Sequence, residues 1–265
     1  QAGYDYLIQG MGGLMSITGV PDGEPGAGPL RVGVAVGDLS SGLYATVGIL
    51  AALNHRHVTG VGQYIDISLL DTMVAMLANQ GQNYFVGGQV PRRTGAEHPN
   101  LAPYRSFGTR DGHLIIAVGN DSQFRALCGV LGIGELAEDE RFRTNAARVK
   151  NRREIAQLIE AKTRERAMGE LAAVLEAAGV PAGPINSFDQ VFSDPQVQHR
   201  KLRFDLPHPL GGRVTGVRNP LLFSETPAEH TRPPPMLGEH TDEVLARVAG
   251  LDAGEISALR TRKVI

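Results

Sequence analysis

Cysteine and tryptophan are almost missing from this sequence of 265 residues, which contains one cysteine, Cys128, and no tryptophan. A single cysteine cannot form a disulfide within the chain and is typical of a reducing compartment, so we expect a cytoplasmic protein. Neither sign of charge is in excess, with 26 Lys and Arg against 28 Asp and Glu. This balance argues against a protein recruited to nucleic acid or to a membrane surface by bulk charge.

Long hydrophobic runs are also missing. The longest candidate, residues 43–53, is interrupted by Thr46 and Gly48. It falls short of the roughly 18–20 residues that cross a bilayer. We therefore expect no membrane-spanning segment and no membrane partner. The chain opens on Gln1 without any pattern of a secretory signal peptide.

Glycine, in contrast, is abundant, with 33 residues, many of them near the start. Gly and Pro dominate residues 1–37, which predicts loops there. Within this stretch Val32, Val34 and Val36 alternate with other residues, and this period predicts a short strand that ends just before Asp38.

A helix–strand–helix pattern follows this first predicted strand. The first helix is capped by Ser40 or Ser41 and ends near residues 55–57. A strand is predicted at 64–67 and a second, apolar helix at 69–82. Strands that alternate with helices are typical of an α/β layer architecture, which is the fold class we expect.

The rest of the chain changes character twice. Residues 86–103 are polar and rich in Gly and Pro, which indicates a linker or a substrate loop. We therefore expect a first domain at 1–85, a small α+β domain at 104–182, and a return segment at 183–265 that packs on the first domain. The expected elements are a strand at 112–119 and helices at 122–131, 149–163, 168–178, 241–249 and 252–262. In the last helix, Asp252 and Glu255 have the spacing of a capping box.

Metal and nucleotide motifs are not evident. Among eight histidines only His55 and His57 are close together, and a surface pair at a helix end explains them better than metal ligation. No Walker loop, G-x-S-x-G elbow or H-E-x-x-H pattern is present. We therefore expect no metal site.

Asp38 is the best local candidate for chemistry. It lies in GDLSSG, between the predicted strand and the predicted helix. The positive end of a helix favours an ionised carboxylate, and that is the form a nucleophile needs. An aspartate in a turn or at a helix N-cap explains the same pattern, and the local sequence does not decide between them.

Longer blocks carry a resemblance that covers essentially the whole chain, in order from residue 3 to residue 265. The blocks are GYDYLIQGMGGLMSITG, VAVGDLSSGLYATVGILAAL, TGVGQYIDISLLDTMVAML, APYRSFGTRDGHLIIAVGNDSQF, GVPAGPINSFDQVFSDPQV and PPPMLGEHTDEVL. Together they resemble the class III CoA-transferases, the CaiB/BaiF family, which also includes formyl-CoA:oxalate transferase, carnitine-CoA transferases and α-methylacyl-CoA racemase. GVPAGPIN and RPPPMLGEHT look closest to the transferases of succinate, glutarate and hydroxymethylglutarate.

This resemblance implies a fold, a reaction and partners. The fold would be part of a Rossmann-like CoA-binding domain plus a smaller α+β domain, assembled as an interlocked homodimer. Asp38 matches the family's nucleophile, which moves CoA between carboxylic acids through an aspartyl anhydride and an aspartyl-CoA thioester. An acyl-CoA thioester and a carboxylic acid, here a dicarboxylic acid, would be the substrates, with no tightly bound cofactor and no nucleic acid.

The family's CoA-binding residues lie mainly upstream of that aspartate, so none can be assigned here. We expect the chain to be roughly the last two-thirds of a longer enzyme, with Gln1 as an internal position. Residues 98–102, HPNLA, stand where formyl-CoA transferase has a loop of four glycines, so that loop is absent from this sequence.

Further residues are candidates for substrate binding. Arg92, Arg93 and His98 lie ahead of Tyr104 in the predicted loop. An arginine fork is well shaped to hold the unreacted carboxylate of a dicarboxylic acid. A solvated basic loop is the alternative.

Two positions separate the transferases from the racemase branch of the family. Tyr4 stands where the racemases have a catalytic histidine, and Asp121 where they have a glutamate. A tyrosine, with a pKa near 10, is a poor replacement for imidazole. Tyr4 is thus a substrate contact or a packing residue, and Asp121 is expected to cap a helix. A transferase is favoured over a racemase, and a non-catalytic fragment or CoA-binding protein is the third possibility.

Overall fold

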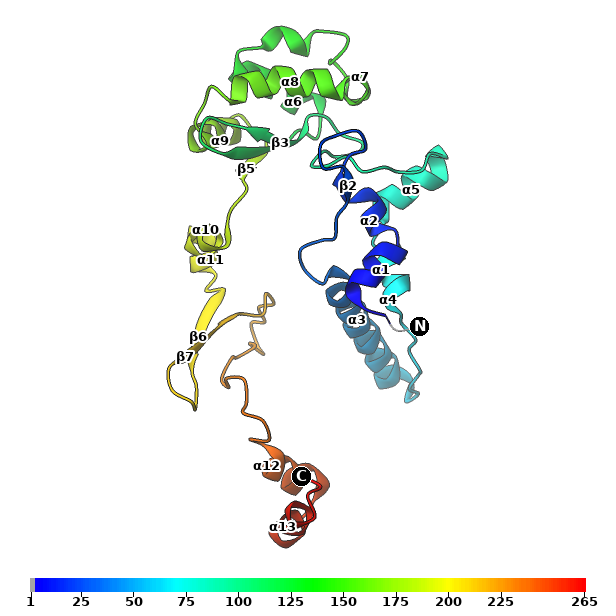
Figure 1. The fold of residues 1–265 in the computed structure, drawn as a ribbon, viewed down its shortest axis with the longest axis vertical. Helices are drawn as coiled ribbons and strands as arrows, with labels where there is room; N and C mark the ends of the chain where they lie inside the picture. The colour runs from blue at the N-terminus through cyan, green and yellow to red at the C-terminus, as the bar shows by residue number, and fades with distance from the viewer. Residues whose placement is uncertain (1–2) are drawn as a thin grey trace. The chain divides into compact units, whose positions relative to one another are not determined.

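The computed structural model describes residues 3–265 (Figure 1). Its contacts divide the chain into two compact units, Gln1–Ile185 and Asn186–Ile265, which are described separately below. Helices dominate both units and the sheets are small, which agrees with the mixed α/β class expected from the sequence. The division at residues 1–85, 86–103, 104–182 and 183–265 stays a prediction.

The first unit begins with short helices rather than with the predicted loops. The elements up to residue 87 are α1 (Asp5–Met11), α2 (Leu14–Ile17), β1 (Gly19–Val20), β2 (Gly28–Pro29), α3 (Val36–Thr59), α4 (Leu69–Ala75) and α5 (Ala78–Gly87). Glycines form the turns between them instead of preventing helices. Gly13, with φ of 86°, separates α1 from α2. Gly12 lets α1 approach α4 closely, because a Cβ there would overlap the Met73 side chain.

The two strands predicted in this region are not formed. Residues 32–35 are coil and Val36 already begins α3, while 64–67 are also coil. An extended segment becomes a strand only when a neighbour accepts and donates its backbone hydrogen bonds. Among residues 3–265, no strand lies beside either segment. The second predicted helix is divided into α4 and α5, with Ala78 at a φ of 44° at the break.

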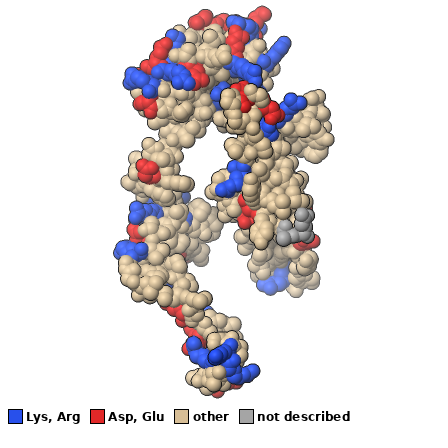
Figure 2. All heavy atoms as spheres, in the orientation of Figure 1, with Lys and Arg blue, Asp and Glu red and all other residues tan. Residues whose placement is uncertain are grey.

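Helix α3 is longer and more exposed than expected. It has 24 residues, and Ser40 lies buried inside it rather than at its cap. By length and composition it could cross a membrane, so the expectation that no segment is long enough was wrong. Only 11% of its most apolar stretch is buried in the described structure. Charged side chains are unevenly distributed over the surface of this unit (Figure 2). The surface over α1–α5 is mostly uncharged, while Lys, Arg, Asp and Glu gather around α7 and α8.

A small module forms the best-packed part of the first unit. Its antiparallel sheet has the order β3–β4–β5, from β3 (Tyr104–Gly108), β4 (His113–Ala117) and β5 (Ala182–Pro184). Its helices are α6 (Asp121–Leu131), the 3-10 helix η1 (Gly134–Ala137), α7 (Asn145–Lys150), α8 (Arg152–Thr163) and α9 (Met168–Ala177). The predicted strand at 112–119 and the helices at 122–131 and 168–178 are confirmed. The helix predicted at 149–163 is confirmed as α8, except that its first two residues belong to α7, which was not predicted.

The core of this module follows the sequence periods. Strand β4 buries Leu114 and Ile116 at a spacing of two. Helix α6 buries Phe124, Leu127 and Leu131, a helical spacing that faces the common core of the module. Each such side chain stabilises the fold by about 1.5–3 kcal/mol when it is fully buried.

The second unit contains α10 (Phe188–Ser193), α11 (Pro195–His199), a hairpin of β6 (Arg203–Pro207) and β7 (Arg213–Val217), α12 (Thr241–Ala249) and α13 (Ala253–Thr261). The predicted capping box is confirmed: the Glu255 N–H donates to Asp252 Oδ1 and the Asp252 N–H donates to Glu255 Oε2, both at 2.8 Å.

We predict that the Cys128 thiol is inert in the folded protein. It is fully buried in α6, and burial raises the pKa of Cys128 from 9.0 to about 11. The folded state thus holds this proton more tightly than the unfolded chain does. The resulting stability is complete below the unfolded pKa of 9.0 and is lost as the pH rises towards about 11. A disulfide reagent at about pH 8 should label Cys128 only after urea is added. Fast labelling of the native protein would contradict this.

Candidate active site

Asp38 lies in the first turn of α3, as the third helical residue. Its side chain is exposed, and among residues 3–265 it forms no hydrogen bond or ion pair. Asp38 is therefore an accessible side chain with no partner among the described residues.

The start of α3 is capped by a side chain from α1. Asp5 Oδ1 accepts a hydrogen bond from the Gly37 N–H at 2.8 Å. The N-cap residue of α3, Ala35, has no side chain that could do so. Ser40 and Ser41, the predicted caps, are the fifth and sixth residues of the helix. The cap is thus supplied by a residue more than thirty positions earlier.

Gln9 extends this contact to the segment before α3. Its amide Nε2 donates to Asp5 Oδ2 at 2.7 Å, and its Oε1 accepts from the Val32 N–H at 2.9 Å. Gln9 is fully buried. Side chains of α1 therefore accept hydrogen bonds from backbone N–H groups of the segment that was predicted to pair as a strand.

Gly37 allows this close contact. It is buried, and a Cβ at this position would lie 3.1 Å from Asp5 Oδ1 and 3.2 Å from Met73 Cε. Met73, on α4, has no exposed surface. The residue before Asp38 is thus packed between α1 and α4, which fixes where α3 begins.

Tyr4, a predicted substrate contact, is the N-cap residue of α1 and stands beside Asp5 in the chain. Its side chain is 76% exposed. The Asp5–Gly37 hydrogen bond brings the backbone around Tyr4 near the start of α3. Among the described residues little covers the Tyr4 ring, and its contact with substrate stays a prediction.

His98 and Tyr104 are brought together by the structure. Their ring centroids are 5.1 Å apart, and the His98 N–H donates to the Tyr104 carbonyl at 3.0 Å. The His98 Nδ1 accepts from the Asn100 N–H at 3.1 Å. The two rings form one side of a loop whose backbone is turned back on itself.

The two arginines of the predicted loop are in different situations. Arg92 is exposed. Arg93 is half-buried, and it donates to the Val20 carbonyl at 2.9 Å and pairs with Asp22, which fastens the loop to the β1–β2 hairpin. No contact within residues 3–265 joins Arg92, Arg93, His98 or Tyr104 to Asp38.

Three side chains of α7 and α8 hold the HPNLA segment. Asn145 Nδ2 donates to the Asn100 carbonyl at 2.9 Å, Arg148 Nε donates to the Ala102 carbonyl at 2.7 Å, and Arg152 donates to the Pro99 carbonyl at 2.7 Å. Asn145, Arg148 and Arg152 are three and four positions apart, so they lie along one side of the helical segment. Side chains thus occupy the backbone carbonyls of this segment. The backbone of a glycine loop at this position would instead be exposed.

Asp121 has a different role from the predicted one. The helix cap of α6 is Asn120, whose Oδ1 accepts from the Gln123 N–H at 2.9 Å. Asp121 instead pairs with Arg148 at 2.8 Å. Sequence reasoning placed the cap one residue too late, because Asn and Asp are equally good caps.

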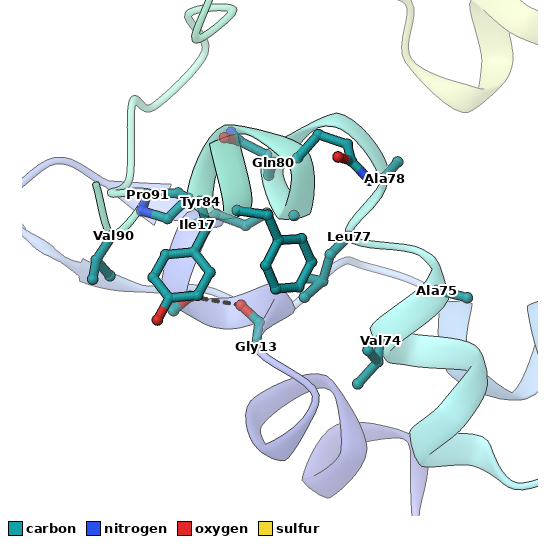
Figure 3. A pocket seen from close by; sticks show the side chains of 14 residues that line it. Gly13, Ile17, Val74, Ala75, Leu77, Ala78, Gln80, Tyr84, Val90 and Pro91 are labelled. Atoms are coloured by element: carbon teal, nitrogen blue, oxygen red, sulfur yellow. Dashed lines mark hydrogen bonds between the residues drawn. The ribbon is translucent and has the colours of Figure 1, made fainter. Parts of the chain in front are cut away.

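An apolar cavity of about 580 Å³ lies between α2, α4 and α5. Figure 3 shows Tyr84 of α5 across from Gly13, with Ile17, Leu77 and Val90 around them. This cavity escaped sequence analysis because its lining comes from three separate stretches. Asp5 and Gln9 also escaped it, although their spacing of four on one helix face was a usable signal.

The family model described as CoA-transferase family III matches residues 1–241. The chain is 50% identical over 251 residues to a succinate–glutarate CoA-transferase of Agrobacterium fabrum, covering 95% of this chain and 62% of that protein. It is 36% identical over 265 residues to a succinyl-CoA:glutarate CoA-transferase of Homo sapiens, covering 100% and 60%. A crystal structure of a CAIB/BAIF family protein from Brucella suis matches with a TM-score of 0.76 and 47% identity, covering 93% of this chain and 63% of that one.

The similarity to the solved structure shows the structural class, a mixed helix and strand protein with the CAIB/BAIF fold. The chain belongs to CoA-transferase family III. The predicted family and fold are therefore confirmed. The chain spans about 60% of the length of the curated relatives it matches.

Proposed function

We propose that this protein transfers CoA from an acyl-CoA to a dicarboxylic acid, with Asp38 as the nucleophile. The names of the relatives support transfer between succinate and glutarate types of acid. The observation that carries the proposal is the position of Asp38, an exposed carboxylate at the start of a long helix with no partner within residues 3–265.

The first half of the reaction loads CoA onto the protein. A carboxylate oxygen of Asp38 attacks the thioester carbon of the donor, the C–S bond breaks, and CoA leaves as thiolate. The product is a mixed anhydride that conserves the energy of the thioester. The thiolate then attacks the Asp38 carbonyl carbon, and the donor acid leaves as carboxylate with the bridging oxygen.

The second half runs the same steps with the acceptor. An acceptor carboxylate oxygen attacks the aspartyl thioester and releases CoA thiolate. The thiolate then attacks the acyl carbon of the acceptor, which releases the Asp38 carboxylate and the new acyl-CoA. These reaction steps need no net proton transfer, so a general base is not required at Asp38.

The exposed Arg92 guanidinium is suited to hold the second carboxylate of the acceptor. Arg93 is less available, because Val20 and Asp22 already occupy it. The neighbouring rings of His98 and Tyr104, which are tilted by 47° to each other, offer a contact beside this loop, and Tyr4 contacts substrate near the start of α3. All four contacts are proposals.

The oxygen balance gives a sharp test. Each turnover leaves one acceptor oxygen on Asp38, so acceptor labelled with ¹⁸O should make the peptide that contains Asp38 heavier by one label. Direct attack of the acceptor on the donor thioester would leave this peptide unlabelled, and that result would overturn the covalent route. The measurement is peptide mass spectrometry after one turnover of the complete protein.

A racemase of the same family is the alternative reaction. It requires two bases near the α-carbon of the substrate. Tyr4 is a weak base, and Asp121 is engaged with Arg148. We expect no exchange of the substrate α-proton with deuterated water in the absence of an acceptor acid. Exchange without transfer would favour the racemase. A protein that binds acyl-CoA but catalyses neither reaction would be a binding protein.

We also propose that the protein acts as a homodimer in the cytoplasm. The exposed apolar face of α3 supports a protein partner, because large uncovered apolar surfaces mark interaction sites. The buried thiol Cys128 fits a reducing compartment. Light scattering of the complete protein should give twice the mass of one chain.

A further inference from the structure

We propose that Asp5 and Gln9 are positioning residues that keep Asp38 free for chemistry, an inference that rests on the proposed role of Asp38. Neither residue needs to touch the substrate. Their task is to satisfy the backbone around the start of α3, so that the Asp38 carboxylate is not consumed in capping its own helix.

The backbone donors at the start of α3 already have acceptors other than Asp38. The first N–H groups of a helix have no partner inside the helix, and a nearby carboxylate readily accepts from them. Here the Gly37 N–H donates to Asp5 at 2.8 Å, and the Val36 N–H donates to the Val34 carbonyl at 2.8 Å. With both donors occupied, Asp38 remains exposed and has no partner in the part of the chain that the structure describes.

The second step concerns the direction of the hydrogen bonds. Asp5 offers two acceptors, one for Gly37 and one for Gln9. Gln9 donates through its nitrogen to Asp5 and accepts through its oxygen from Val32. Turning the Gln9 amide over would place a donor against the Val32 N–H. Only one arrangement therefore satisfies all the groups, and it pins the backbone at positions 32 and 37.

Helix α1 also holds residues 32–37 rigidly. The two anchors lie one turn apart on α1, and Gln9 is fully buried. Helix α1 in turn contacts α4, because Gly12 lies against Met73. A misplaced reacting group costs much of the advantage of a preorganised site. Release of either anchor would let residues 32–37 move and would carry Asp38 with them.

The test exchanges the hydrogen-bonding roles of the two residues. In Asp5→Asn the new amide donor faces the Gln9 donor, and in Gln9→Glu two carboxylates face each other. In the double variant D5N/Q9E, the amide at position 5 donates to the carboxylate at position 9. That carboxylate still accepts from Val32, and total charge is unchanged. Each single variant should lower kcat about 10–50-fold with KM nearly unchanged, and the double variant should recover at least about fivefold.

Asp111 provides a matched control. Its carboxylate accepts from the Met168 N–H at 2.7 Å and so caps α9 from another element, as Asp5 caps α3. Helix α9 carries no proposed catalytic group. Asp111→Asn should therefore leave kcat unchanged, although it replaces a capping carboxylate by an amide just as Asp5→Asn does.

The outcomes separate the two proposals. Melting temperature and hydrogen exchange of the peptide over residues 30–40 report on folding in every variant. Single variants that exchange faster but keep kcat would overturn the positioning role. A double variant whose kcat is as low as that of the single variants would overturn the positioning role as well. If Asp38→Asn kept full activity, the proposed function would fail instead, whatever Asp5 and Gln9 do.

Discussion

Asp38→Asn should lower the rate of CoA transfer by at least about 10³-fold, because removal of a covalent nucleophile leaves only binding and positioning. The amide is nearly the same size as the carboxylate, but its oxygen is a poor nucleophile. Since the Asp38 side chain has no partner in the described structure, the substitution should not change folding. The melting temperature should therefore stay unchanged while kcat is lost.

The control for this prediction is Asp71→Asn. Asp71 is exposed and is the third residue of α4, as Asp38 is the third residue of α3. Transfer should remain within about twofold of the wild type, as for surface substitutions away from special features. Hydroxylamine added together with acyl-CoA should trap an activated carboxyl at Asp38 only. Activity of Asp38→Asn above a few percent would show that another group is the nucleophile.

Arg148→Leu should destabilise the small module by about 3–5 kcal/mol, since a buried ionic group is lost and its partners stay behind. Arg148 has no exposed surface, and its guanidinium donates to the carbonyls of Ala102 and Phe142 and pairs with Asp121. It also lies 4.4 Å from the centre of the Phe124 ring. Leucine fills much of the volume but leaves the two carbonyls without a donor.

Urea unfolding followed by circular dichroism would measure this loss. Arg141→Leu is the control, because Arg141 also forms ion pairs, with Asp139 and Glu154, but its side chain is 53% exposed. Surface pairs contribute little to stability. Equal destabilisation by the two variants would show that the burial of Arg148 is not the source of its effect.

The small module was predictable because its signals are local. Leu114 and Ile116 alternate, and Phe124 and Leu127 follow the helical period, so the pattern along the chain already defines the buried face. The first part of the chain was not predictable in this way. The alternation of Val32, Val34 and Val36 is compatible with a strand, but a strand also needs a neighbour.

The candidate site was predictable in part. The resemblance indicated Asp38, and the adjacency of His98 and Tyr104 is visible in the structure. The commitment of Arg93 to Asp22 and of Asp121 to Arg148 depends on residues distant in the sequence. No local pattern reports such pairs, because they form only when separate elements pack together.

The cap that Asp5 supplies to α3 has an evolutionary consequence. Two carboxylates share the work at this helix end: one secures the fold and the other is free to react. A descendant that lost Asp38 would therefore keep its stability and could persist as an inactive paralogue. Selection for turnover alone, and not selection for folding, retains an aspartate at position 38.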